Sequence, residues 1–133
     1  MRGDAFKAAV EARDEAALAA ALSADVTFRS PAVFRPYVGR DLVMVVLSAA
    51  ATVFEGLRYE RRFEAEDGEA LKFSARIGDR ELDGVDLLRF DAVGLVTELT
   101  VMVRPLSGLN ALVAAMGREL ERRGVTAPGR SRG

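Results

Sequence analysis

The spacing of apolar residues changes once along the chain. Up to about residue 54 they recur every three or four positions, as on one face of a helix. From residue 57 they alternate with polar residues, as in half-buried strands. Asp14 is typical of a helix N-cap, so the first helical tract is divided there. The predicted elements are helices over 4–12 and 14–23, a strand over 25–31 and a loop over 32–39, then a helix over 40–54, strands over 57–66, 69–77, 81–91 and 95–104, and a helix that starts at Pro105.

The strands differ in how apolar their two faces are. In 57–66, the alternation puts Leu57, Tyr59, Phe63 and Ala65 on one face and charged residues on the other. In 95–104, Leu99, Val101 and Val103 share one face, while Val96, Thr100 and Met102 leave the opposite face partly apolar. An outer sheet face of that kind favours contact with a second copy of the chain, so we expect a homodimer.

A run of helices followed by a run of strands is typical of an α+β fold. We predict a strongly curved antiparallel sheet, wrapped into a cone by the N-terminal helices and the C-terminal helix. At 133 residues the chain is long enough for one packed domain, which we place at 1–123. The segment 124–133 is rich in Gly and short of apolar residues, and is expected to be disordered.

Composition excludes several kinds of chemistry. The chain has no Cys and no His, so thiolate chemistry and imidazole catalysis are absent, and neither a metal nor an organic cofactor is implied. The net charge of −1 argues against nucleic acid as a partner. No apolar stretch is long enough to span a membrane, and no signal peptide is evident, so we expect a cytoplasmic protein.

One acid is out of place in this pattern. Asp86 lies in the strand 81–91 between Val85 and Leu87, on the face that also carries Leu82 and Leu88. If that face is concave, Asp86 projects into the cone, and loss of solvation raises its pKa. Two structural alternatives stay open. Asp86 pairs with an internal Arg, for which Arg61 is the candidate, or it lies on the outer surface or in a dimer contact.

Two segments carry a family resemblance. In the stretch ADVTFRSPAVFRPYVGRD, an acid is separated by five residues from a Pro, and a loop then leads to Gly-Arg-acid before a helix. The stretch LDGVDLLRFDAVGLVTELTVMV is similar to a last hairpin with Phe-Asp before the turn. Over residues 4–120 the chain resembles the nuclear transport factor 2-like superfamily, in its SnoaL-like and ketosteroid isomerase-like branch. The resemblance implies the cone fold but no single activity.

The resemblance to ketosteroid isomerase can be followed residue by residue. The motif that carries its hydrogen-bond-donating acid is matched by Asp86-Leu87-Leu88-Arg89-Phe90-Asp91, with Asp86 as that acid. Ser30 stands where the isomerase has its Asp base, and Phe6 replaces its first-helix Tyr. Two further pocket tyrosines fall on Leu22 and Leu47, and Phe73 keeps an aromatic wall. The sequence therefore does not predict the isomerase reaction. Limonene epoxide hydrolase is not predicted either, because a second inward-facing carboxylate is missing.

Two functions follow from these observations. The first is a cone that binds a small, mostly apolar molecule, with Asp86 as polar anchor and as the one candidate catalytic group. The predicted ligand-binding residues are Phe6, Leu22, Ser30, Leu47, Tyr59, Phe73, Asp86, Leu99 and Val101. The second is a non-catalytic homodimeric or protein-interaction module with a filled core. If the ligand-binding cone is also an enzyme, proton transfer without a cofactor is the expected chemistry.

Overall fold

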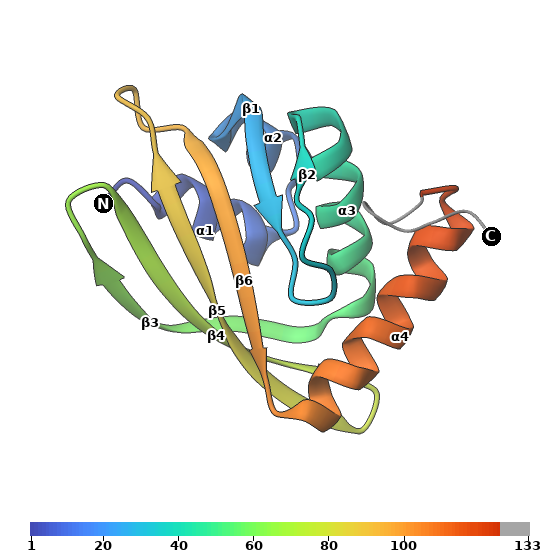
Figure 1. Ribbon diagram of the computed structural model, residues 1–133. Helices are drawn as coiled ribbons and strands as arrows, with labels where there is room; N and C mark the ends of the chain where they lie inside the picture. The colour runs from blue at the N-terminus through green and yellow to red at the C-terminus, as the bar shows by residue number, and fades with distance from the viewer. Residues whose placement is uncertain (126–133) are drawn as a thin grey trace.

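The computed structural model describes residues 1–125, which form four α-helices and six β-strands (Figure 1). The strands make one sheet in the order β2-β1-β6-β5-β4-β3. The helices are α1 (Asp4–Ala12), α2 (Glu15–Ala21), α3 (Arg40–Val53) and α4 (Leu106–Arg122). The strands are β1 (Leu22–Arg29), β2 (Tyr37–Val38), β3 (Glu55–Glu64), β4 (Gly68–Ile77), β5 (Arg80–Phe90) and β6 (Val96–Arg104).

The sheet curves strongly, and the helices pack against its concave side (Figure 1). The long strands β3 to β6 pair antiparallel in chain order, as expected for a meander. β1 joins the sheet by a parallel pairing with β6, which makes the sheet mixed. This arrangement confirms the predicted α+β cone.

The helix boundaries follow the sequence signals closely. The predicted helix 4–12 is α1, and the Asp14 side chain caps α2 by accepting a hydrogen bond from the Ala17 amide at 3.0 Å. α2 ends earlier than predicted, because Leu22 already pairs with Val96 in the sheet. The short strand β2 lies within the predicted loop 32–39 and pairs with β1.

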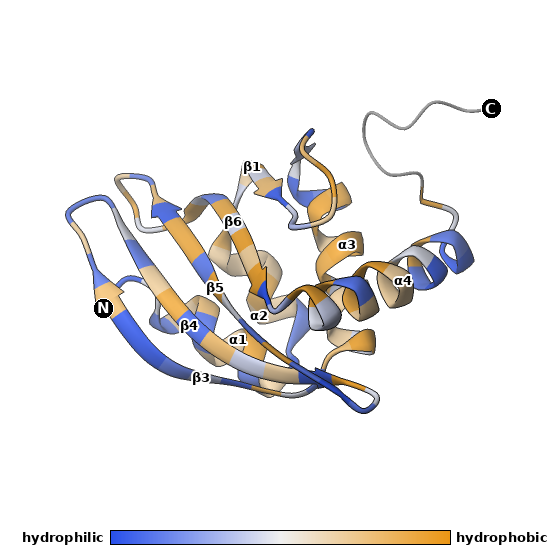
Figure 2. Cartoon of the chain, turned by 60° about the horizontal axis from the view of Figure 1, so that its bottom comes forward, coloured by the Kyte–Doolittle hydropathy of each residue, from blue (hydrophilic) through white to orange (hydrophobic). Residues whose placement is uncertain are grey.

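The predicted alternation of β3 is wrong beyond Tyr59. Tyr59 pairs with Phe73 and Arg61 with Lys72, so the residue between them is extra and forms a β-bulge. A bulge exchanges the two faces of the strand that follows it. Phe63 is therefore 51% exposed, with the Arg61 guanidinium 4.7 Å above its ring. Figure 2 shows β3 as mostly hydrophilic, whereas α3 is largely hydrophobic.

A second register shift changes which residues of β6 lie on the outer face of the sheet. Val96 was predicted to lie on that face, but it is 1% exposed. The β5–β6 pairing shifts between Arg89 and Phe90, which turns the start of β6 inward. Met102 and Leu87 remain on the outer face, 54% and 38% exposed. The outer face is thus apolar over a smaller area than the sequence pattern indicates.

The last described residues close the domain. Gly124 has a φ of +76°, and the Val125 amide donates to the Leu120 carbonyl at 2.9 Å, so the chain turns back onto the core after α4. The remainder of the predicted tail, 126–133, lies outside the described residues. Within residues 1–125, no helix has the length and apolar character needed to cross a membrane.

Candidate functional site

A cavity of about 390 Å³ lies inside the cone. Its wall is largely apolar and draws on the helices as well as on the concave side of the sheet. A volume of this size falls within the range of small-molecule sites in proteins. The aromatic residues of the wall are Phe6, Phe28, Tyr37, Phe54, Tyr59 and Phe73.

Asp86 projects into this cavity from the middle of β5. It pairs across the sheet with Leu71 of β4 and Val101 of β6, and it is 7% exposed. Its neighbour Leu87 points outward, so the prediction that this face is concave is confirmed. Both alternatives for Asp86 are excluded: it is not on the outer surface, and Arg61 stacks on Phe63 instead.

The partner of Asp86 is a phenol, not a cation. The Tyr59 hydroxyl donates a hydrogen bond to Asp86 Oδ2 at 2.6 Å. Burial raises the pKa of Asp86 to about 7, although this hydrogen bond opposes the rise. Burial and the Asp86 charge also raise the pKa of Tyr59 well above its usual value. Asp86 therefore takes up and releases a proton near neutral pH, inside an apolar cavity.

The structure brings most of the predicted ligand-binding residues to one cavity. The residues in its wall are Phe6, Ser30, Leu47, Tyr59, Phe73, Asp86, Leu99 and Val101. Leu22 is not among them, because it begins β1 and is fully buried against the core. Ser30 reaches the cavity, but its Oγ accepts the amide hydrogens of Ala32 and Val33, so it also shapes the turn after β1.

Gly84 makes room for the aromatic wall. It lies opposite Phe73 in the β4–β5 pairing. A Cβ added there would come within 2.8 Å of the Phe73 ring and 2.3 Å of the Met102 carbonyl. No larger residue fits at this position without moving the ring that lines the cavity.

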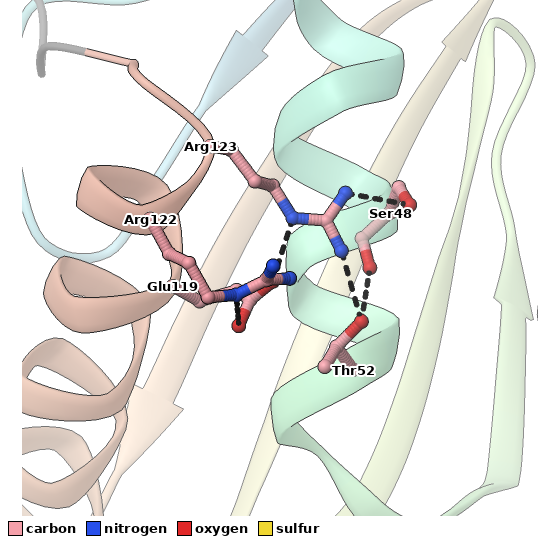
Figure 3. Close-up of polar contacts among 5 residues, drawn as sticks. All are labelled: Ser48, Thr52, Glu119, Arg122 and Arg123. Carbon is pink, nitrogen blue, oxygen red and sulfur yellow. Dashed lines mark hydrogen bonds and ion pairs between the residues drawn. The ribbon is translucent and has the colours of Figure 1, made fainter.

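Polar residues gather at the cavity wall near the helices. Arg13, which joins α1 to α2, donates to the Phe54 carbonyl at 3.2 Å. Arg123, just after α4, reaches α3, where Nη1 donates to Ser48 Oγ and Nη2 to Thr52 Oγ1, both at 3.1 Å (Figure 3). Both guanidinium groups belong to residues in the cavity wall.

Glu119, in the last turns of α4, holds the Arg123 side chain in place. Arg123 Nε donates to Glu119 Oε2 at 2.7 Å, and Arg122 contacts the same carboxylate (Figure 3). Arg122 and Arg123 lower the pKa of Glu119 to about 2. The carboxylate therefore stays charged, and it neutralises the Arg123 guanidinium that closes the seam between α3 and α4.

Sequence reasoning missed these polar residues. Ser48 and Thr52 are four positions apart on α3, and Arg123 continues the helical spacing of Leu112, Met116 and Leu120 just past the end of α4. The sequence therefore shows that these residues share a helix face, but it does not show which face lines the cavity. Arg13 carries no sequence signal beyond its place between two predicted helices. Within residues 1–125, no group of three or more acidic, His or Cys side chains is arranged to hold a metal ion.

Comparison with solved structures finds close relatives. A steroid delta-isomerase from Pseudomonas aeruginosa is 40% identical, with a TM-score of 0.85, over 91% of this chain and 90% of that one. The chain belongs to the nuclear transport factor 2-like superfamily, in its ketosteroid isomerase-like branch. An uncharacterised bacterial protein from Silicibacter pomeroyi is 30% identical, with a TM-score of 0.88, over 92% of this chain and 87% of that one.

More distant members of the superfamily show the fold alone. A nuclear transport factor 2-like protein of unknown function from Mesorhizobium loti is 22% identical, with a TM-score of 0.67, over 75% of this chain and 85% of that one. The sequence matches no family model, and no curated protein is detectably similar to it. Membership of this superfamily therefore establishes the cone, and the chemistry must be argued from the site.

Proposed function

We propose that the cone binds a small, mostly apolar molecule and that Asp86 holds one polar atom of it, a carbonyl or hydroxyl oxygen. The observation that carries this proposal is the Tyr59–Asp86 hydrogen bond inside an apolar cavity. A neutral Asp86 can donate its own proton to a ligand oxygen while Tyr59 stays hydrogen-bonded to it. The 40% identity to a steroid delta-isomerase supports a fused-ring ketone as the first ligand to test.

The residues around Asp86 favour binding over the isomerase reaction. Ser30 replaces the expected Asp base, and the other carboxylates of the wall, Asp14 and Glu15, lie where α1 meets α2. If the protein is catalytic, Asp86 is the group that would move a proton. The alternative, a protein-interaction module with a filled core, is disfavoured by a cavity of about 390 Å³ that reaches Asp86.

Substitution of Asp86 tests the proposed anchor. With the steroid enone androstenedione as probe, Asp86→Leu should weaken binding at pH 6 at least about tenfold, because the ligand carbonyl is left without a donor. Asp86→Asn keeps an N–H donor and should retain most of the affinity. Isothermal titration calorimetry or quenching of tyrosine fluorescence measures both.

The pH dependence identifies the form of Asp86 that binds. A carbonyl needs the protonated acid, so wild-type affinity should fall about tenfold per pH unit well above the Asp86 pKa of about 7, while that of Asp86→Asn stays flat. An affinity for androstenedione that is constant or rises above pH 7 would show that the protonated acid is not the form that binds. Equal binding by wild type and Asp86→Leu at every pH would disprove the anchor.

We also propose that the outer sheet face forms a homodimer. Leu87 and Met102 are exposed on neighbouring strands of that face, and Val85 lies opposite Met102. Exposed apolar side chains grouped on a sheet face are typical of a contact surface.

Charged residues on that face test the dimer. Leu87→Glu with Met102→Glu should halve the mass of the particle to 14.3 kDa in size-exclusion chromatography with light scattering. Phe34→Glu is the matched control, because Phe34 is 96% exposed but lies in the loop before β2. A wild-type monomer at high protein concentration would contradict the proposal.

A further inference from the structure

Arg13 is held in an unusual conformation at the cavity wall. Its φ of +54° lies in the left-handed region, where Gly or Asn is the usual residue after a helix. A longer side chain at such a position suggests that the side chain itself is used. One nitrogen of its guanidinium donates to the Phe54 carbonyl at 3.2 Å, which leaves further N–H groups.

Arg13 differs from the other cation of the wall. Arg123 is neutralised by Glu119 and satisfied by Ser48 and Thr52 (Figure 3). Within residues 1–125, no acidic side chain forms an ion pair with Arg13. Its guanidinium therefore has the capacity to bind a carboxylate from outside the chain.

The two acids of the wall that are close to Arg13 in sequence already interact with the start of α2. Asp14 caps α2 through the Ala17 amide. Glu15 lies in the first turn of α2, where the helix dipole favours a negative charge. Neither acid is an ion-pair partner of Arg13, so Arg13 remains the cation of the wall that is available to a ligand.

We propose that the cavity selects an apolar ligand that also carries a carboxylate, and that Arg13 binds this carboxylate while Asp86 holds the neutral oxygen. This rests on the function proposed above, because it assigns a second group to the same ligand. The ligand class is then an apolar keto or hydroxy acid, with one neutral oxygen among the aromatic residues and one anion beside Arg13.

Matched ligands separate the two proposals. The probes are androstenedione, steroid enones that carry a carboxylate on the ring farthest from the enone, directly or through a short side chain, and the methyl esters of those acids. We expect at least one acid to bind about tenfold tighter than its ester, because a charge-assisted hydrogen bond is lost on esterification. Arg13→Gln should remove this preference, so that the acid and its ester bind equally well.

Arg58→Gln is the control for loss of one positive charge, because Arg58 is largely exposed on β3. It should keep the preference for the acid. If androstenedione binds but no acid binds better than its ester, or if Arg13→Gln keeps the preference, the role of Arg13 is disproved while the anchor stands. If no probe binds, both proposals fail.

Discussion

Replacement of Asp86 by Asn should stabilise the protein, and more at pH 8 than at pH 5. Asp86 is buried, and its pKa is raised from 3.8 to about 7. Each unit of difference between the folded and unfolded pKa is worth about 1.4 kcal/mol. The penalty for ionising Asp86 in the fold is therefore on the order of 4 kcal/mol at pH 8, and Asn does not incur it.

The sign follows from proton binding in the two states. Between the unfolded pKa near 3.8 and the folded pKa near 7, the folded protein holds the Asp86 proton and the unfolded chain has lost it. Stability therefore falls as pH rises through this window. At pH 5 only a minor part of the penalty is present, roughly 1–2 kcal/mol, so the advantage of Asn is smaller there.

Urea unfolding of wild type and Asp86→Asn at pH 5, 6, 7 and 8 measures this difference. Asp79→Asn is the control, because Asp79 is 96% exposed in the β4–β5 turn and should give a difference that is small at every pH. If the stability difference does not change between pH 5 and pH 8, Asp86 does not titrate in that window. A strand residue that destabilises its own fold near neutral pH is typical of a functional site.

The position of Asp86 was predictable because side chains alternate regularly between the two faces of the sheet along β5. Leu82, Gly84, Asp86 and Leu88 face inward at alternate positions, as the sequence pattern requires. The same reasoning failed for Phe63 and Val96. In both cases a register shift, after Tyr59 and near Phe90, exchanged the two faces. A bulge depends on pairing with another strand, so a single strand read alone does not show it.

The partners of Asp86 were harder to predict than its position. Arg61 was the candidate cation in one of the structural alternatives, and Tyr59 was placed in the wall without a stated partner. The bulge after Tyr59 leaves the Tyr59 hydroxyl 2.6 Å from Asp86 and places Arg61 outside, over Phe63. Arg13 and Arg123 reach the cavity from the ends of helices. Their side chains depend on how those helices pack, which periodicity does not determine.

The second large effect is expected from substitution of Arg62, which the bulge in β3 turns inward. Arg62 Nε donates to Glu69 Oε2 at 2.6 Å, and its Nη1 contacts Asp4 Oδ1 of α1 at 2.7 Å. The Glu69 side chain is only 1% exposed. Arg62→Met should therefore cost about 3–5 kcal/mol in urea unfolding, because it leaves a buried carboxylate without its cation.

A double substitution separates the net contribution of the Arg62–Glu69 pair to the free energy of unfolding from the destabilisation caused by removing one partner. Arg62→Met with Glu69→Leu should recover most of the lost stability, since no buried charge remains. Lys72→Met is the control: Lys72 also bridges β3 and β4, by its contact with Glu60, but that pair is exposed and should cost at most about 1 kcal/mol. A loss in Arg62→Met no larger than that would mean the cluster does not stabilise the fold.

The same cluster connects the stability of the fold to the cavity. Through Asp4 it holds the start of α1 against β3 and β4, and Phe6 of α1 forms part of the cavity wall. Arg62→Met should therefore raise hydrogen exchange in α1 more than in α4, which packs against α3 and against β4, β5 and β6. Equal protection of both helices would show that α1 is held by its apolar face alone, and that the ion cluster acts only on the β3–β4 hairpin.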